Sequence, residues 1–125
     1  MRIFKNKWFA KFARKEEISD EKLIQAVRDV DAGNIDADYG GGVIKQRIAR
    51  PQEGKSGGYR TIILYRKDDT AFFVYGFAKS VLGNIDKADV LGFKKLAKIM
   101  ISLSRPQLET LLEKGEIEEI SHEEI

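Results

Sequence analysis

The sequence lacks cysteine and holds a single histidine, His122, among its 125 residues. The absence of cysteine excludes a disulfide framework, thiolate metal sites and a Cys-His catalytic pair. One histidine excludes a metal site built from several imidazoles, and a Ser-His-Asp triad would depend on His122 alone, which lies in an acidic stretch. We therefore expect neither a metal nor a cofactor, and any catalysis must use other side chains.

Long apolar runs are also missing. No run of 18 apolar residues is present, so we expect no membrane-spanning helix and no membrane partner. The first twelve residues, MRIFKNKWFAKF, alternate charged and aromatic side chains and lack the apolar segment of a signal peptide. With 42% hydrophobic and 34% charged residues, the chain has the composition of one globular domain, and a cytoplasmic location is the simplest expectation.

The net charge of +2 conceals an asymmetry along the chain. Residues 109–125 hold seven glutamates and one lysine, which leaves 21 basic and 13 acidic residues, a net charge of +8, in residues 1–108. A basic body favours a polyanionic partner, because neutralising phosphates releases their counterions. The same excess could equally serve solubility alone.

The order of hydrophobic patterns predicts an α+β fold with helices at both ends of the chain. We expect a possible short strand over residues 2–5, then one helix over 7–15 and a second that Ser19 caps and Gly33 follows. Residues 34–42, with three consecutive glycines, predict a loop. Two C-terminal helices should begin after Asp86 and Ser104.

Between these helices lie three strand-like runs, over residues 43–48, 59–66 and 71–78, which short connections join into an antiparallel meander. We expect the helices to cover one face of this sheet and to leave the other face free for a ligand. The domain should span residues 1–115. The acidic tail, residues 116–125, should fray.

Two familiar site patterns fail on inspection. Gly54-Lys55-Ser56 resembles the end of a phosphate-binding P-loop, but Ala49 stands where that pattern needs glycine, and a strand follows where a helix is required. Paired aspartates occur beside the glycine loop, at Asp36 and Asp38, and in the hairpin at residues 68–69, and both pairs are typical of turns.

What remains is a basic and aromatic set on the strands. Lys45 and Arg47 are two residues apart and project from one face, Arg60 opens the next strand, and Lys79 follows the third. Arg50 and Lys55 could steer phosphates, and Tyr59, Tyr75 and Phe77 could stack on unpaired bases. Such cations could activate a ribose 2′-hydroxyl and stabilise a pentavalent phosphorane. The alternative is an ordinary solvated sheet face with extended cationic side chains.

Four runs resemble the RelE/HigB toxins of bacterial type II toxin–antitoxin systems, most closely a HigB-like branch. They are residues 7–11 (KWFAK), 35–51 (IDADYGGGVIKQRIARP), 54–61 (GKSGGYRT) and 73–79 (FVYGFAK). The resemblance implies the RelE-like fold and a metal-independent endoribonuclease that cuts mRNA, often on the ribosome, and inhibits translation. It also implies a cognate antitoxin, typically a small helix-turn-helix protein, with operator DNA bound only through that antitoxin.

The resemblance further implies roles for four residues. Lys45 would be the base or activator of the 2′-hydroxyl, Arg47 and Arg60 would stabilise the phosphorane, and Lys79 would assist the charge or the leaving group. RelE-type sites commonly add a tyrosine or histidine near the C-terminus, and His122 does not match that context, so a general acid is not identified. Two alternatives stay open: a ParE-like inhibitor of DNA gyrase, which shares the fold, and a catalytically inactive module that binds RNA or a partner.

Overall fold

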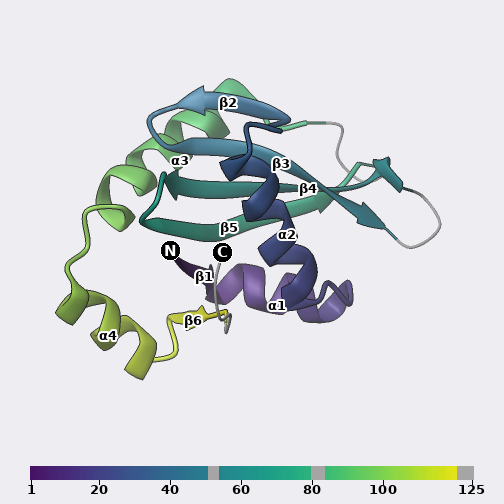
Figure 1. The fold of residues 1–125 in the computed structure, drawn as a ribbon. Helices are drawn as coiled ribbons and strands as arrows, with labels where there is room; N and C mark the ends of the chain where they lie inside the picture. The colour runs from purple at the N-terminus through teal and green to yellow at the C-terminus, as the bar shows by residue number, and fades with distance from the viewer. Residues whose placement is uncertain (51–53, 80–83, 121–125) are drawn as a thin grey trace.

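A computed structural model describes residues 1–50, 54–79 and 84–120, with the backbone alone at 54–57. Its elements are, in order, β1 (Arg2–Asn6), α1 (Lys7–Lys15), α2 (Asp20–Asp31), β2 (Ala37–Gly40), β3 (Val43–Arg50), β4 (Gly54–Arg66), β5 (Thr70–Ala78), α3 (Lys87–Met100), α4 (Arg105–Glu113) and β6 (Ile117–Glu119). The predicted α+β class is confirmed (Figure 1). No helix in the described ranges is long and apolar enough to cross a membrane.

One six-stranded sheet, in the order β2-β3-β4-β5-β1-β6, organises the molecule. Strands β2 to β5 form an antiparallel meander, β1 runs parallel to β5, and β6 pairs antiparallel with β1. The predicted three-stranded meander and the first strand are therefore confirmed, as parts of a larger sheet.

Side-chain caps explain where the helices begin. The side chain of Ser19 accepts a hydrogen bond from the Lys22 amide, and Asp86 and Ser104 each form a reciprocal capping box with the residue three positions later. After α2, Gly33 takes a left-handed backbone conformation with φ of +87°. These caps were predicted from the sequence and are confirmed.

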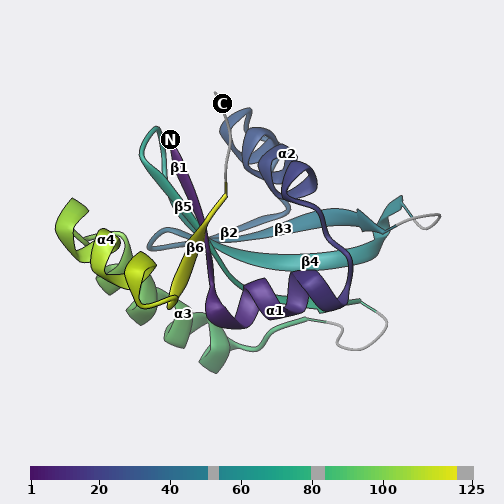
Figure 2. The same cartoon turned by 90° about the horizontal axis from the view of Figure 1, so that it is seen from below.

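Helices pack on both faces of the sheet. Buried residues of α2, such as Leu23 and Val27, belong to a core cluster with Ile44 and Ile63, while Ala97 of α3 lies in a second cluster on the other face. Figure 2 shows α2 and α3 on opposite sides of the strands. The expectation that one face would stay uncovered is wrong, because β5 and its neighbours are apolar on both faces and each face requires a covering layer.

Helix α1 packs closely against β5 at a glycine of that strand. Strand β1 pairs with residues 70–73 of β5, and α1, which follows β1 directly, contacts β5, β1 and β6. A Cβ atom built on Gly76 would lie 2.6 Å from Cε2 of Phe12, so this contact requires the absence of a side chain. The glycine therefore sets how closely α1 approaches β5.

Three segments expected to be irregular belong to the sheet. Residues 37–40 form the edge strand β2, and Gly41 and Gly42, with φ of +62° and +83°, turn it back into β3. Strand β4 begins at Gly54, five residues before the predicted start, because Gly54 pairs with Arg50. Ile117 and Ile120, in the segment predicted to fray, are buried, and the Ile120 amide donates to the carbonyl of Ile3 at 2.8 Å.

Candidate functional site

Three of the four predicted catalytic cations converge on one carboxylate. Lys45 and Arg47 come from one face of β3, and Arg60 is paired with Arg47 across the β3–β4 ladder. The Oδ1 atom of Asp36 lies 2.7 Å from Nε of Arg47. Its Oδ2 atom lies 3.6 Å from Nζ of Lys45 and 3.9 Å from Nε of Arg60. We call Lys45, Arg47, Arg60 and Asp36 the cation cluster.

A buried glutamine, Gln46, binds the backbone of Asp36. The Asp36 amide donates to Oε1 of Gln46 at 3.0 Å, and Nε2 of Gln46 donates to the carbonyl of Asn34 at 2.8 Å. Because Gln46 is buried, these bonds fix the chain that enters β2 against β3. Sequence reasoning assigned Asp36 to a turn. The missed signal was the β2–β3 hairpin, whose register of Ala37 opposite Lys45 places Asp36 beside the two cations.

The cluster carries three positive charges and one negative charge, and its members differ in access to solvent. The side chain of Arg47 is 45% exposed, whereas those of Asp36 and Arg60 are only 10% and 6% exposed. Lys45 also donates to Oδ1 of Asn84 at 3.2 Å. An anion such as a phosphate would therefore meet Arg47 first, with Lys45 and Arg60 beneath it.

The fourth predicted cation, Lys79, lies outside this cluster. It is exposed, directly after β5, and its amide donates to the carbonyl of Gly58 at 3.3 Å. Phe77, two residues earlier, is paired with Arg60, so Lys79 lies at the same end of the sheet. No ion pair in the described part of the chain joins Lys79 to Asp36.

Two of the three aromatic residues predicted to stack on bases are buried, which contradicts that role for the free protein. Phe77 belongs to the core cluster beneath α3. Tyr59 lies on the opposite face from Arg60, its ring edge against Phe12 and its hydroxyl donating to Oε1 of Glu16 at 3.1 Å. Alternation along a strand identified the faces correctly, but it could not show that helices cover both of them.

The remaining RNA-binding candidates have mixed outcomes. The guanidinium of Arg50 lies 5.4 Å from the centre of the Tyr59 ring, which places it with the face opposite to the cation cluster. The side chain of Lys55 lies outside the described residues. Tyr75 is half-buried on the face of the cation cluster, in register with Ile62, which is itself paired with Lys45.

An exposed tryptophan covers Tyr75. Trp8, in α1, is 46% exposed, and its ring lies 4.7 Å from the Tyr75 ring, centre to centre. It also stacks on Phe12 at 5.3 Å. Trp8 is therefore an exposed aromatic ring beside Tyr75, which was predicted to stack on a base. Nothing in the sequence indicated that Trp8 would be exposed at the start of α1.

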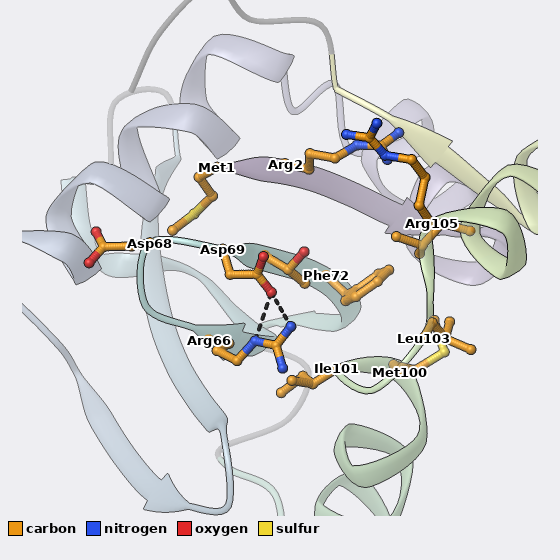
Figure 3. A pocket seen from close by; sticks show the side chains of 12 residues that line it. Met1, Arg2, Arg66, Asp68, Asp69, Phe72, Met100, Ile101, Leu103 and Arg105 are labelled. Atoms are coloured by element: carbon orange, nitrogen blue, oxygen red, sulfur yellow. Dashed lines mark hydrogen bonds and ion pairs between the residues drawn. The ribbon is translucent and has the colours of Figure 1, made fainter.

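A pocket of about 350 Å³ at the other end of β4 contains several charges but differs from the cation cluster (Figure 3). Two of its arginines are already paired with carboxylates: Arg66 with Asp69, and Arg2 with Glu119 at 2.8 Å. The hydrogen bonds that Arg2 donates to Glu119 contribute most to raising the pKa of Arg2 above its ordinary value. A second, shallower hollow of about 540 Å³ adjoins Asp36 and Arg47. Of these two, only the second borders exposed cationic groups of the cation cluster.

Comparison with known proteins gives one match. A family model described as the RelE toxin of the RelE/RelB toxin–antitoxin system matches residues 1–120. Searches of curated proteins and of solved structures found no significant match.

Proposed function

Because this chain belongs to the family of RelE toxins of RelE/RelB toxin–antitoxin systems, we propose that it cleaves mRNA at the cation cluster and so inhibits translation. The match over residues 1–120 confirms the RelE resemblance read from the sequence, while the HigB-like branch stays a prediction. The main support for the proposed chemistry is the convergence of Lys45, Arg47 and Arg60 on a single carboxylate.

The reaction that suits such a cluster is transfer of the phosphate to the neighbouring ribose oxygen. The 2′-hydroxyl attacks phosphorus, a P–O2′ bond forms, and the P–O5′ bond breaks to leave a 2′,3′-cyclic phosphate and a 5′-hydroxyl. Arg47 and Arg60 would stabilise the extra negative charge of the phosphorane, since donors aimed at developing charge contribute most in a partly buried site. The 2′-hydroxyl would lose its proton to water while Lys45 stabilises the developing 2′-alkoxide, and Lys79 would deliver a proton to the departing 5′ oxygen.

Partners follow from the same proposal. The substrate would be mRNA on the ribosome in the cytoplasm, and Trp8 with Tyr75 offers aromatic surface on which an unpaired base could stack. A cognate antitoxin, a small helix-turn-helix protein, would neutralise the toxin and alone would contact operator DNA.

A double substitution tests the site in cells. Lys45→Ala/Arg60→Gln removes two of the three cations, and a matched control, Lys95→Ala/Lys98→Ala, removes two exposed lysines of α3. Induced wild-type protein should arrest growth and create new 5′ ends within coding regions. The double variant should lose at least about 10²-fold in cleavage, the effect of losing one transition-state donor. The control should behave as the wild type.

Other outcomes would redirect the assignment. Arrest that persists in the double variant would reject the cation cluster as the site. Arrest with intact transcripts and a DNA-damage response would indicate a gyrase inhibitor. Folded expression of the wild type without arrest would indicate an inactive partner-binding module.

A further inference from the structure

Asp36 is the one member of the cation cluster to which neither the sequence motifs nor the proposed reaction assigns a part. We propose that Asp36 is a positioning residue, whose buried carboxylate holds Lys45, Arg47 and Arg60 in the arrangement that receives the phosphate. This inference rests on the proposed function for its catalytic consequence, although the positioning itself does not depend on any activity.

The need for a counter-charge follows from the ladder register. Arg47 and Arg60 are directly paired on neighbouring strands, and like charges in such a pair repel each other. Lys45 adds a third positive charge on the same face. The two oxygens of Asp36 face all three, at 2.7, 3.6 and 3.9 Å, so one carboxylate offsets repulsion that would otherwise separate the side chains.

Burial makes the arrangement rigid. Oδ2 of Asp36 is shielded from solvent and accepts no hydrogen bond from any described residue. A buried carboxylate oxygen is costly unless positive charge compensates it, so Asp36 depends on Lys45 and Arg60 as they depend on it. The Gln46 bond to the Asp36 backbone fixes the position from which the carboxylate projects.

The geometry indicates that Asp36 supports the cations and does not compete with a phosphate for them. Arg47 uses Nε for Asp36, and in the described part of the chain no partner engages its two terminal nitrogens. Its side chain is also far more exposed than that of Asp36. Asp36 therefore binds Arg47 from within, and the two terminal nitrogens of Arg47 stay available to an incoming anion.

Asp36→Asn tests the catalytic consequence, since it keeps the shape and removes the charge. The matched control is Asp38→Asn, which makes the same charge change on β2, where Asp38 is exposed and its side chain, among the described residues, accepts a hydrogen bond only from the Gly40 amide. Single-turnover cleavage of a short mRNA bound to ribosomes should fall about 10²-fold in Asp36→Asn at saturating protein, the cost of misplacing reacting groups by about 1 Å. RNA affinity should be no weaker than in the control, because both variants gain one unit of positive charge. Asp36→Glu, which keeps the charge, should be faster than Asp36→Asn.

An arm without RNA tests the positioning directly. Asp36→Asn, Arg47→Gln and the double variant form a thermodynamic cycle of unfolding by urea. The two substitutions should be non-additive by at least about threefold in the unfolding equilibrium constant, as for residues in direct contact. Additive effects would overturn the inference, whatever happens to RNA.

The remaining outcomes also test whether Asp36 is a positioning residue. A cleavage rate in Asp36→Asn equal to that of the control would overturn the positioning role. A rate and an affinity that both rise would identify Asp36 as a competitor for the phosphate and would overturn it too. If the wild type does not cleave mRNA on ribosomes, the proposed function fails, and the unfolding cycle still decides whether Asp36 holds the three cations.

Discussion

At the scale of single residues, one carboxylate links the stability of the protein to its proposed chemistry. The three cations that Asp36 contacts are those that would bind a phosphate. Alternation along β3 was enough to place Lys45 and Arg47 together, because side chains two apart share a face. It could not supply Asp36, whose role depends on a strand pairing, nor the burial of Tyr59 and Phe77, which depends on helices packed from outside the sheet.

A part-buried hydroxyl–carboxylate pair, Tyr65 with Asp31, makes stability depend on alkaline pH. The hydroxyl of Tyr65 donates to Oδ1 of Asp31. Burial, followed by the charge and hydrogen bond of Asp31, raises the pKa of Tyr65 above its ordinary value of 10.0. A raised pKa in the folded state means that the contribution to stability is full below pH 10 and is lost as pH rises through the folded value.

The free energy of unfolding should therefore fall more steeply above pH 10 in the wild type than in Tyr65→Phe. Urea denaturation at several pH values from 8 to 11 measures this difference. Parallel curves for the two proteins would show that Tyr65 does not titrate differently in the folded state.

At the scale of elements, the long periodic segments followed local rules and the short strands did not. Helices α2 to α4 began at the expected caps because those caps are made by neighbouring side chains. Strands β2 and β6 have only four and three residues, and they exist because β3 and β1 offer unpaired edges to them. Three consecutive glycines looked like an irregular loop, although two of them form the turn that makes β2 possible.

The contact between α1 and β5 yields a prediction with an internal control. Gly76→Ala should destabilise the protein by about 1–3 kcal/mol, because the new Cβ would overlap Phe12 in a packed core. Gly92→Ala should stabilise it by about 0.5–1 kcal/mol, since Gly92 is inside α3 and nothing lies within 4 Å of its added methyl. Thermal denaturation of both variants measures the signs, and equal effects would contradict the proposed role of Gly76.

At the scale of the whole molecule, the acidic and basic parts of the chain are joined rather than separate. The C-terminal strand β6 lies beside β1, and its glutamates pair with cations from the N-terminal region, Glu119 with Arg2 and Glu118 with Arg14. The cation cluster has its own internal carboxylate and borders a hollow beside β2 and β3. Composition alone indicated a basic body, but it could not show which cations are neutralised within the fold and which face outward.

The central claim is that the cation cluster cleaves RNA by attack of the ribose 2′-hydroxyl. Purified protein, incubated with ribosomes that carry a short mRNA, provides the most direct measurement, which is the chemical identity of the new ends. We predict 5′-hydroxyl and 2′,3′-cyclic phosphate ends, and no cleavage of an oligonucleotide that carries 2′-deoxyribose at the cut position. New 5′-phosphate ends, or cleavage that persists without the 2′-hydroxyl, would contradict the account.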